Sequence, residues 1–322
     1  MLRILLASAI AALAALKIEP AAAQDYPVRT VRIVFPLAAG GGGDVYTRAL
    51  ADELQKAWRQ PVVVENRPGG GQNIGARACA EATPDGYTIC VMSSEPAVYN
   101  QFLFKTIPYD PDKDFQPIAN LFANTLAFVV NSDLKVKTVD ELIALAKVKP
   151  GLSYATFAFP MAAYMEKLKQ QEGIDIIRVP YRGGGEGVNA LLGGITPVAV
   201  LALSNMVPQL QSGRLTALAV NSRTRSPLFP DVPTFTEARP KGGEYPPTWF
   251  GLFTQAAVPR PIVEKIAADV TRIIAAPAFR QRIYVERAVE PVSETLDVFA
   301  RFLRAERKIA ERIVKESGEQ PK

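Results

Sequence analysis

The sequence of 322 residues contains no histidine. Histidine is the general base of Ser-His-Asp and Cys-His nucleophile systems, and many zinc sites use its imidazole as a ligand. Its absence therefore excludes these hydrolase mechanisms and every zinc site that needs an imidazole. We expect a protein that is not an enzyme and that carries no cofactor and no metal ion.

Cysteine is almost as rare, since the chain has only Cys79 and Cys90. The hydrophobic pattern predicts that Cys79 lies late in a helix and that Cys90 lies in the strand after a Pro-Asp-Gly turn. The two residues could pair in an oxidising compartment, but a disulfide requires closely spaced Cα atoms, and a sequence does not provide that distance. A disulfide and two buried free thiols therefore both remain open.

Long hydrophobic runs are confined to the N-terminus. Arg3 precedes an apolar run at residues 4–16, which is short for a membrane span, and alanines at residues 21–23 follow it. This pattern predicts a signal peptide over residues 1–23, cleaved before about Gln24, and an exported, soluble protein in the periplasm. No cysteine follows the signal directly, which excludes a lipid anchor at a new N-terminal cysteine.

Charge of one sign is not concentrated anywhere in the chain. The formal net charge is +5, and basic and acidic residues are interspersed. Binding to a nucleic-acid backbone requires a stripe or patch of Lys and Arg. We therefore expect no nucleic-acid partner.

A glycine run between a strand and a helix is the most informative feature that the chain does contain. The apolar residues 31–35 predict a strand, Gly40–Gly43 follow, and a helix with an apolar face begins near Asp44. The first N–H groups of a helix have no partner within it, and the helix dipole adds a partial positive charge. The pattern predicts a binding site for a carboxylate or phosphate, and this site needs no cationic side chain. A flexible tether is the alternative.

Strands and helices alternate along the chain with short connections, which is typical of α/β proteins with mainly parallel sheets flanked by helices. The chain after residue 23 exceeds the size that one hydrophobic core supports. Two extended stretches, at residues 115–130 and 248–254, bracket the middle third. We expect a first lobe of residues 24–124 plus 249–322, a second lobe of residues 125–248, and a ligand cleft between them.

Eight short segments, each common on its own, occur in an order that together is characteristic of one protein family. They are Pro36–Asp44, Gln60–Gly75, Pro84–Thr88, Pro108–Phe115, Val179–Gly183, Leu191–Gly194, Pro230–Thr234 and Trp249–Phe253. Over essentially the whole chain beyond the signal, these segments resemble the solute-binding proteins of tripartite tricarboxylate transporters, the Bug or TctC-like family.

The resemblance implies a two-lobed periplasmic-binding-protein fold of the type II kind that closes on a small organic carboxylate. It implies delivery to the permease subunits of a membrane transporter, and we expect a monomer. A binding protein that presents its ligand to a membrane sensor has the same sequence requirements, so this partner remains an alternative. An anion-handling or phosphate-handling enzyme is disfavoured, because the loop at residues 40–44 lacks the endings of a P-loop and of a dinucleotide fingerprint.

In the family, loop amides, hydroxyl groups and ordered waters hold the ligand carboxylate. Carried over by position, the ligand-binding residues fall on a first-lobe loop, the end of the third strand and a second-lobe loop. They are Leu37, Ala39, Gly40, Gly41, Gly42, Gly43 and Asp44; Ser93 and Ser94; and Thr156, Phe157, Ala158 and Phe159. Arg182 is the candidate for a cationic contact, with a solvent-facing role as the alternative. Gly183–Gly185 would let the second lobe approach the ligand.

Two of these sets allow a second interpretation. Asp44 stands where an N-cap residue is expected, so we expect its carboxylate to cap the first helical turn, with a ligand contact as the alternative. Ser93 and Ser94 either donate to an anion or satisfy the backbone at the strand end.

The chain departs from the family pattern in the second lobe. Small hydroxyl residues are replaced by the segment Tyr154–Met161, which contains Phe157 and Phe159, and a common aspartate aligns with Leu201. These changes suggest a ligand with a hydrophobic part, such as an aromatic or medium-chain carboxylate. The alternatives are that both phenylalanines lie in the core, or that the chain no longer binds a typical family ligand.

Overall fold

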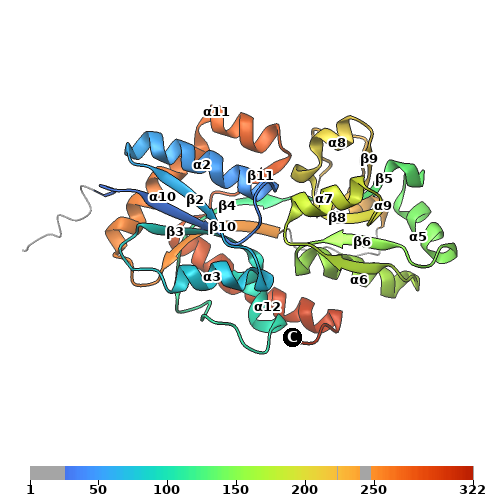
Figure 1. Ribbon diagram of the computed structural model, residues 1–322, viewed down its shortest axis with the longest axis horizontal. Coiled ribbons are helices and arrows are strands. Elements are labelled where there is room, and N and C mark those ends of the chain that lie inside the picture. The colour runs from blue at the N-terminus through green and yellow to red at the C-terminus, as the bar shows by residue number, and fades with distance from the viewer. Residues whose placement is uncertain (1–25, 223, 240–247, 322) are drawn as a thin grey trace, which may run out of the picture.

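The computed structural model describes residues 26–222, 224–239 and 248–321, and the predicted signal peptide lies outside these residues. Two sheets lie side by side along the long axis, each flanked by helices (Figure 1). The first has six strands in the order β11-β4-β10-β3-β1-β2. Its strands are β1 (Val31–Phe35), β2 (Val62–Asn66), β3 (Thr88–Ser93), β4 (Phe115–Asn124), β10 (Thr248–Gln255) and β11 (Val289–Pro291).

The second sheet has five strands in the order β7-β6-β8-β5-β9. They are β5 (Leu126–Asn131), β6 (Ser153–Thr156), β7 (Ile177–Pro180), β8 (Val198–Ala202) and β9 (Leu215–Val220). The α/β class and the two-lobed fold are confirmed, but the sheets are mixed rather than mainly parallel. The reason is the connectivity, because β5 and β10, the first strand after each passage between the sheets, pair antiparallel with their neighbours.

Helices cover both faces of each sheet (Figure 1). Those of the first lobe are α2 (Gly42–Trp58), α3 (Asn73–Ala80), α4 (Asn100–Leu103), α10 (Arg260–Ala275), α11 (Pro277–Phe279) and α12 (Leu296–Ser317). Those of the second lobe are α5 (Val139–Val148), α6 (Phe159–Glu172), α7 (Gly184–Leu192), α8 (Val207–Gln211) and α9 (Phe235–Ala238). Short 3-10 or π turns are η2 (Gly70–Gln72), η3 (Glu95–Tyr99), η4 (Ser132–Leu134), η5 (Leu203–Asn205) and η6 (Arg280–Val285).

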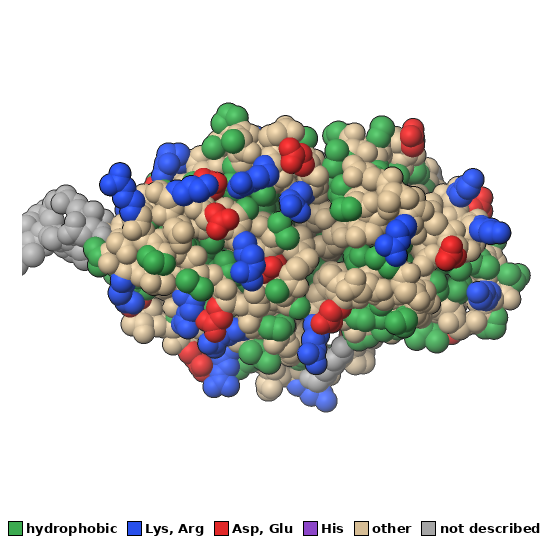
Figure 2. Space-filling model, turned by 45° about the horizontal axis from the view of Figure 1, so that its top comes forward, with side chains coloured by type: hydrophobic (Ala, Val, Ile, Leu, Met, Phe, Trp, Pro, Cys, Tyr) green, Lys and Arg blue, Asp and Glu red, His purple; other side chains and the backbone are tan. Residues whose placement is uncertain are grey.

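Each lobe has its own hydrophobic core, built from buried strand residues and the inner faces of the helices. Helix α12 shows why the sequence folds this way, since its buried residues Phe299, Leu303, Ala310 and Val314 recur at helical spacing. Among the described residues, none of the helices combines the length and the apolar character that crossing a membrane requires. On the face shown in Figure 2, basic and acidic side chains are mixed.

Cys79 of α3 and Cys90 of β3 form a disulfide, with their Cα atoms 6.2 Å apart. This separation lies within the range that disulfides adopt. Of the two alternatives that the sequence leaves open, the structure therefore contains the disulfide. The bond ties α3 to the strand that ends at Ser93.

The two lobes are connected at Thr125, between β4 and β5, and again ahead of β10. They also touch away from these connections. Arg178 of β7 forms an ion pair of 3.4 Å with Glu319, just beyond α12, and Gly42 of α2 is hydrogen-bonded to Asn205 of η5. The structure is therefore a closed arrangement of the lobes.

Candidate ligand site between the lobes

The starts of helices α2 and α7 face each other across the interface between the lobes. Helix α2 begins after the C-terminal end of β1, and α7 begins after the C-terminal end of β7. A Cβ atom at Gly41 would lie 3.8 Å from the amide nitrogen of Gly184, and one at Gly185 would lie 3.7 Å from the carbonyl oxygen of Gly40. Two positive helix ends therefore converge on one place, an arrangement that favours an anion.

Close approach of the two lobes leaves little room for a side chain at Gly42 and Gly184. The N-cap residues, Gly41 and Gly183, have no side chain that could cap the helix. A Cβ atom at Gly42 would lie 2.6 Å from the hydroxyl oxygen of Ser204, and one at Gly184 would overlap the Asn205 side chain. The glycine run is therefore part of a packed interface, and the flexible-tether interpretation is wrong.

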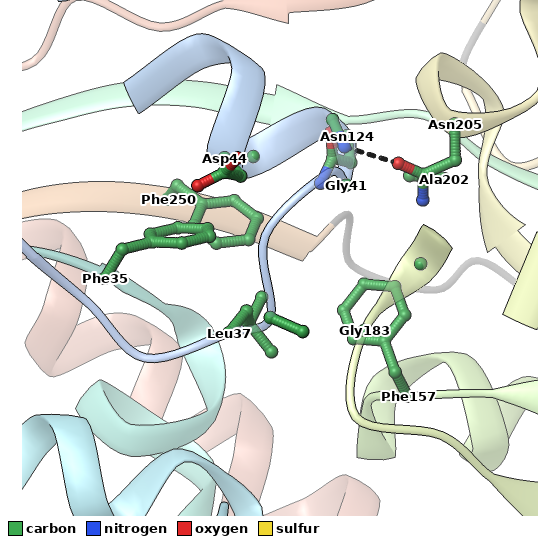
Figure 3. Close-up of a pocket in the computed structure, with 14 residues that line it drawn as sticks. Phe35, Leu37, Gly41, Asp44, Asn124, Phe157, Gly183, Ala202, Asn205 and Phe250 are labelled. Carbon is green, nitrogen blue, oxygen red and sulfur yellow. Dashed lines mark hydrogen bonds between the residues drawn. The ribbon is translucent and has the colours of Figure 1, made fainter. Parts of the chain in front are cut away.

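A small pocket lies beside these helix starts. It is lined by Phe35, Leu37, Ala38, Gly41, Gly42, Gly43, Asp44, Asn124, Phe157, Gly183, Gly184, Ala202, Asn205 and Phe250 (Figure 3). In this closed arrangement the pocket has room for little more than a water molecule, so a ligand enters only when the lobes separate. None of these described lining residues is Lys or Arg, so backbone and amide groups supply its hydrogen-bond donors.

One wall of the pocket is apolar. Phe35, Leu37 and Phe250 come from the first lobe, and Phe157 reaches the same space from the second lobe (Figure 3). The rings of Phe35 and Phe250 lie 5.8 Å apart, and Phe250 stacks on Phe122 in the core behind it. The wall is therefore held in place by the first-lobe core, and both lobes contribute to it.

Asn205 closes the pocket from the second-lobe side. Its side-chain oxygen accepts a hydrogen bond of 2.6 Å from the N–H group of Gly42, one of the first amides of α2 (Figure 3). A neutral amide oxygen thus occupies a position at which an anionic oxygen would bind more strongly. Sequence reasoning did not select Asn205, although it lies in the turn directly after β8, where strand ends form ligand sites.

Asp44 does not cap helix α2, which is a correction of the sequence-based interpretation. The helix starts at Gly42 with Gly41 as its N-cap, so Asp44 is the third helical residue. Its carboxylate accepts hydrogen bonds from Gly40 N at 3.0 Å, Arg48 Nε at 3.0 Å and Asn66 Nδ2 at 2.9 Å. Burial alone would raise the pKa of Asp44, but these bonds outweigh it and lower the pKa. The ionised carboxylate stabilises the loop, and Arg48 offsets its charge.

Several residues that the sequence selected lie outside the pocket. Ala39, Gly40 and Arg182 are exposed, and the backbone N–H of Arg182 donates to Glu186 of α7. Thr156 and Ala158 are buried, and the Thr156 hydroxyl donates to the Ala158 carbonyl. The Arg182 side chain is therefore on the surface, which corresponds to the alternative given for it.

Ser93 belongs to a second polar cluster at the interface. Its hydroxyl lies 2.9 Å from Oε2 of Glu95 and 2.7 Å from Oε1 of Gln72, and its single proton serves one of them at a time. Gln72 Nε2 donates to Glu95 Oε2 at 2.8 Å, and the backbone N–H of Phe159 donates to Glu95 Oε1 at 2.7 Å. The neighbouring Ser94 hydroxyl is buried without a hydrogen-bond partner.

The two second-lobe phenylalanines have different environments. Phe157 lines the pocket, whereas Phe159 is buried against the first-lobe core, with its ring 5.8 Å from that of Tyr99. The expectation that both line the cleft is therefore wrong for Phe159. The cause is local, because β6 ends at Thr156 and α6 begins at Phe159, so the two-residue alternation of a strand does not extend to both.

Comparison with known proteins identifies the family of this fold. Residues 46–319 match the family model described as the tripartite tricarboxylate transporter family receptor. The chain belongs to this family. BugT of Bordetella pertussis is 33% identical over 304 residues, which cover 93% of this chain and 92% of BugT.

Solved structures agree with the family assignment. A protein of R. palustris solved with adipate has a TM-score of 0.88 and 28% sequence identity, covering 92% of this chain and 100% of its own. MatC of Rhodopseudomonas palustris, solved with bound malate, has a TM-score of 0.82 and 30% identity, covering 90% of this chain and 100% of MatC. The resemblance to tripartite tricarboxylate receptors is therefore confirmed.

Proposed function

We propose that this family member captures a small organic carboxylate in the periplasm and delivers it to the permease subunits of a tripartite tricarboxylate-type transporter, without catalysing a reaction. The main support for this proposal is that helices α2 and α7 both begin at the same pocket. Uncapped helix starts at that point supply N–H donors for a carboxylate. The neighbours solved with adipate and malate support this ligand class.

The donors suffice without a cationic side chain. A hydrogen bond to a charged acceptor contributes roughly 1.5–3 kcal/mol, and micromolar binding requires about 8 kcal/mol. Three or four amide donors at Gly41–Gly43 and at Gly184 and Gly185, together with burial of an apolar group, reach that value. The apolar wall of Phe35, Leu37, Phe157 and Phe250 favours an aromatic or medium-chain remainder.

Binding requires the lobes to separate and close again. In the closed structure Asn205 holds the N–H group of Gly42, so an incoming carboxylate replaces the Asn205 oxygen as its acceptor. A ligand that contacts both helix starts stabilises the closed form by its differential affinity for the two states. The closed form is then the species that a membrane partner recognises.

The test is isothermal titration calorimetry of the exported chain with hexanoate, benzoate, adipate, malate and, as a negative control, a nucleotide. Binding of at least one carboxylate is expected to be lost in Gly42→Ala, because the new Cβ would lie 2.6 Å from the Ser204 hydroxyl. Gly193→Ala is the matched control at the other end of α7, where a Cβ finds its nearest neighbour at 3.4 Å. Absence of binding for every carboxylate would refute the proposal.

A further inference from the structure

The second polar cluster at the interface already contains a carboxyl group, and the chain itself supplies it. Glu95 is 4% exposed and lies in η3, directly after the strand β3. One of its carboxylate oxygens accepts a hydrogen bond from the N–H group of Phe159, the first residue of α6 in the other lobe. The other oxygen accepts from Gln72 and lies within hydrogen-bond distance of the Ser93 hydroxyl.

This cluster has the composition of an anion-binding site. Its three donors are a helix-start N–H group, a side-chain amide and a hydroxyl, and all three are neutral. They come from both lobes and meet only when the lobes are closed. A carboxylate in this position therefore links the lobes, as a ligand carboxylate would.

The cluster does not line the pocket, but two of its residues are neighbours of residues that do. Phe157 lines the pocket and lies two residues before Phe159. Phe250 also lines the pocket and pairs with Ser93 in the antiparallel ladder of β10 and β3. A ligand that extends from the α2 and α7 helix starts along the apolar wall therefore approaches the α6 start, where Glu95 lies.

We propose that Glu95 is a specificity-determining residue, because its carboxylate occupies the interlobe position that a second ligand carboxylate would need. This inference rests on the proposed function and narrows its ligand class. The protein takes a monocarboxylate with an uncharged, largely apolar remainder. In the case of a dicarboxylate, the N–H donor at the start of α6 is already bonded to Glu95, whose ionised carboxylate would repel the second ligand carboxylate. That second carboxylate would therefore be buried without a hydrogen-bond partner, which weakens binding.

The test compares acids of equal length that differ in one carboxylate, hexanoate against adipate and 4-methylbenzoate against terephthalate, by calorimetry at pH 8. The wild-type protein is expected to bind the monocarboxylate at least tenfold more tightly, since one charge-assisted hydrogen bond accounts for roughly that factor. Glu95→Ala vacates the α6 donors and is expected to improve dicarboxylate binding at least tenfold. Glu95→Gln keeps the position filled and is expected to retain the preference for monocarboxylates.

Glu306→Ala is the matched control, because Glu306 is also a buried glutamate of the first lobe and accepts its hydrogen bond from Trp249 of the same lobe. It is expected to leave the preference unchanged. Equal or tighter binding of dicarboxylates by the wild-type protein would overturn the inference and leave the proposed function standing, and this comparison needs no variant. Failure of both acid classes to bind the wild-type protein and Glu95→Ala would overturn the proposed function and the inference with it.

Discussion

Replacing Glu95 by Gln is expected to remove a pH dependence of stability that the closed structure predicts. Burial raises the pKa of Glu95 from 4.5 to about 7, even though Ser93, Gln72 and Phe159 favour the ionised form. The native protein therefore keeps a proton on this carboxyl group over a pH range in which the unfolded chain has lost it. Glutamine has the same shape and does not titrate.

The sign and the size follow from linkage. Between about pH 4.5 and pH 7 the native state binds more protons than the unfolded state, so stability falls as the pH rises through this window. At lower pH both states are protonated, and above about pH 7 both are ionised, so the contribution becomes constant. A shift of this size corresponds to about 3 kcal/mol over the window, at 1.36 kcal/mol per pH unit.

The assay is urea unfolding of the wild-type protein and Glu95→Gln at half-unit intervals from pH 4.5 to pH 8.5. As the pH rises, the wild-type protein is expected to lose about 3 kcal/mol of unfolding free energy relative to Glu95→Gln. Above about pH 7 the difference between the two proteins should become constant. A difference that stays flat over the whole range, or that moves in favour of the wild-type protein, would show that Glu95 does not retain its proton in the folded protein.

Three further outcomes are expected. Asn205→Ala removes the acceptor of the Gly42 N–H, so small-angle scattering should show a larger radius of gyration for the ligand-free variant than for the wild-type protein; an identical radius would show that this hydrogen bond does not hold the lobes closed. Phe157→Ala removes part of the apolar wall and should weaken benzoate binding roughly tenfold or more while changing acetate binding little, as measured by calorimetry. Replacing Cys79 and Cys90 together by Ser removes the disulfide and should lower the unfolding free energy by about 2–4 kcal/mol. Equal unfolding free energies for the oxidised wild-type protein and this variant would contradict that estimate.

Short-range signals predicted much of the architecture and part of the site. The apolar strand at residues 31–35, the glycine run and the following helix are where the pattern expects them, because strand periodicity and helix starts depend on neighbouring residues. The pocket accordingly contains Leu37 and Gly41–Gly43. The predicted N-cap, Asp44, lies three residues after the actual N-cap, Gly41, because glycine has no side chain that marks an N-cap and Asp44 is the first residue in the run that has one.

The sequence by itself determined the α/β class, the membership of a receptor family, the glycine-lined helix starts and the presence of aromatic residues near the cleft. Only the tertiary structure decided which groups meet. Gly42 and Asn205 are 163 residues apart, and Glu95 and Phe159 are 64 apart. Each of these pairs joins one lobe to the other, so its contact depends on how the lobes close. No local pattern encodes that geometry, because it results from the packing of both cores and from the two connections between them.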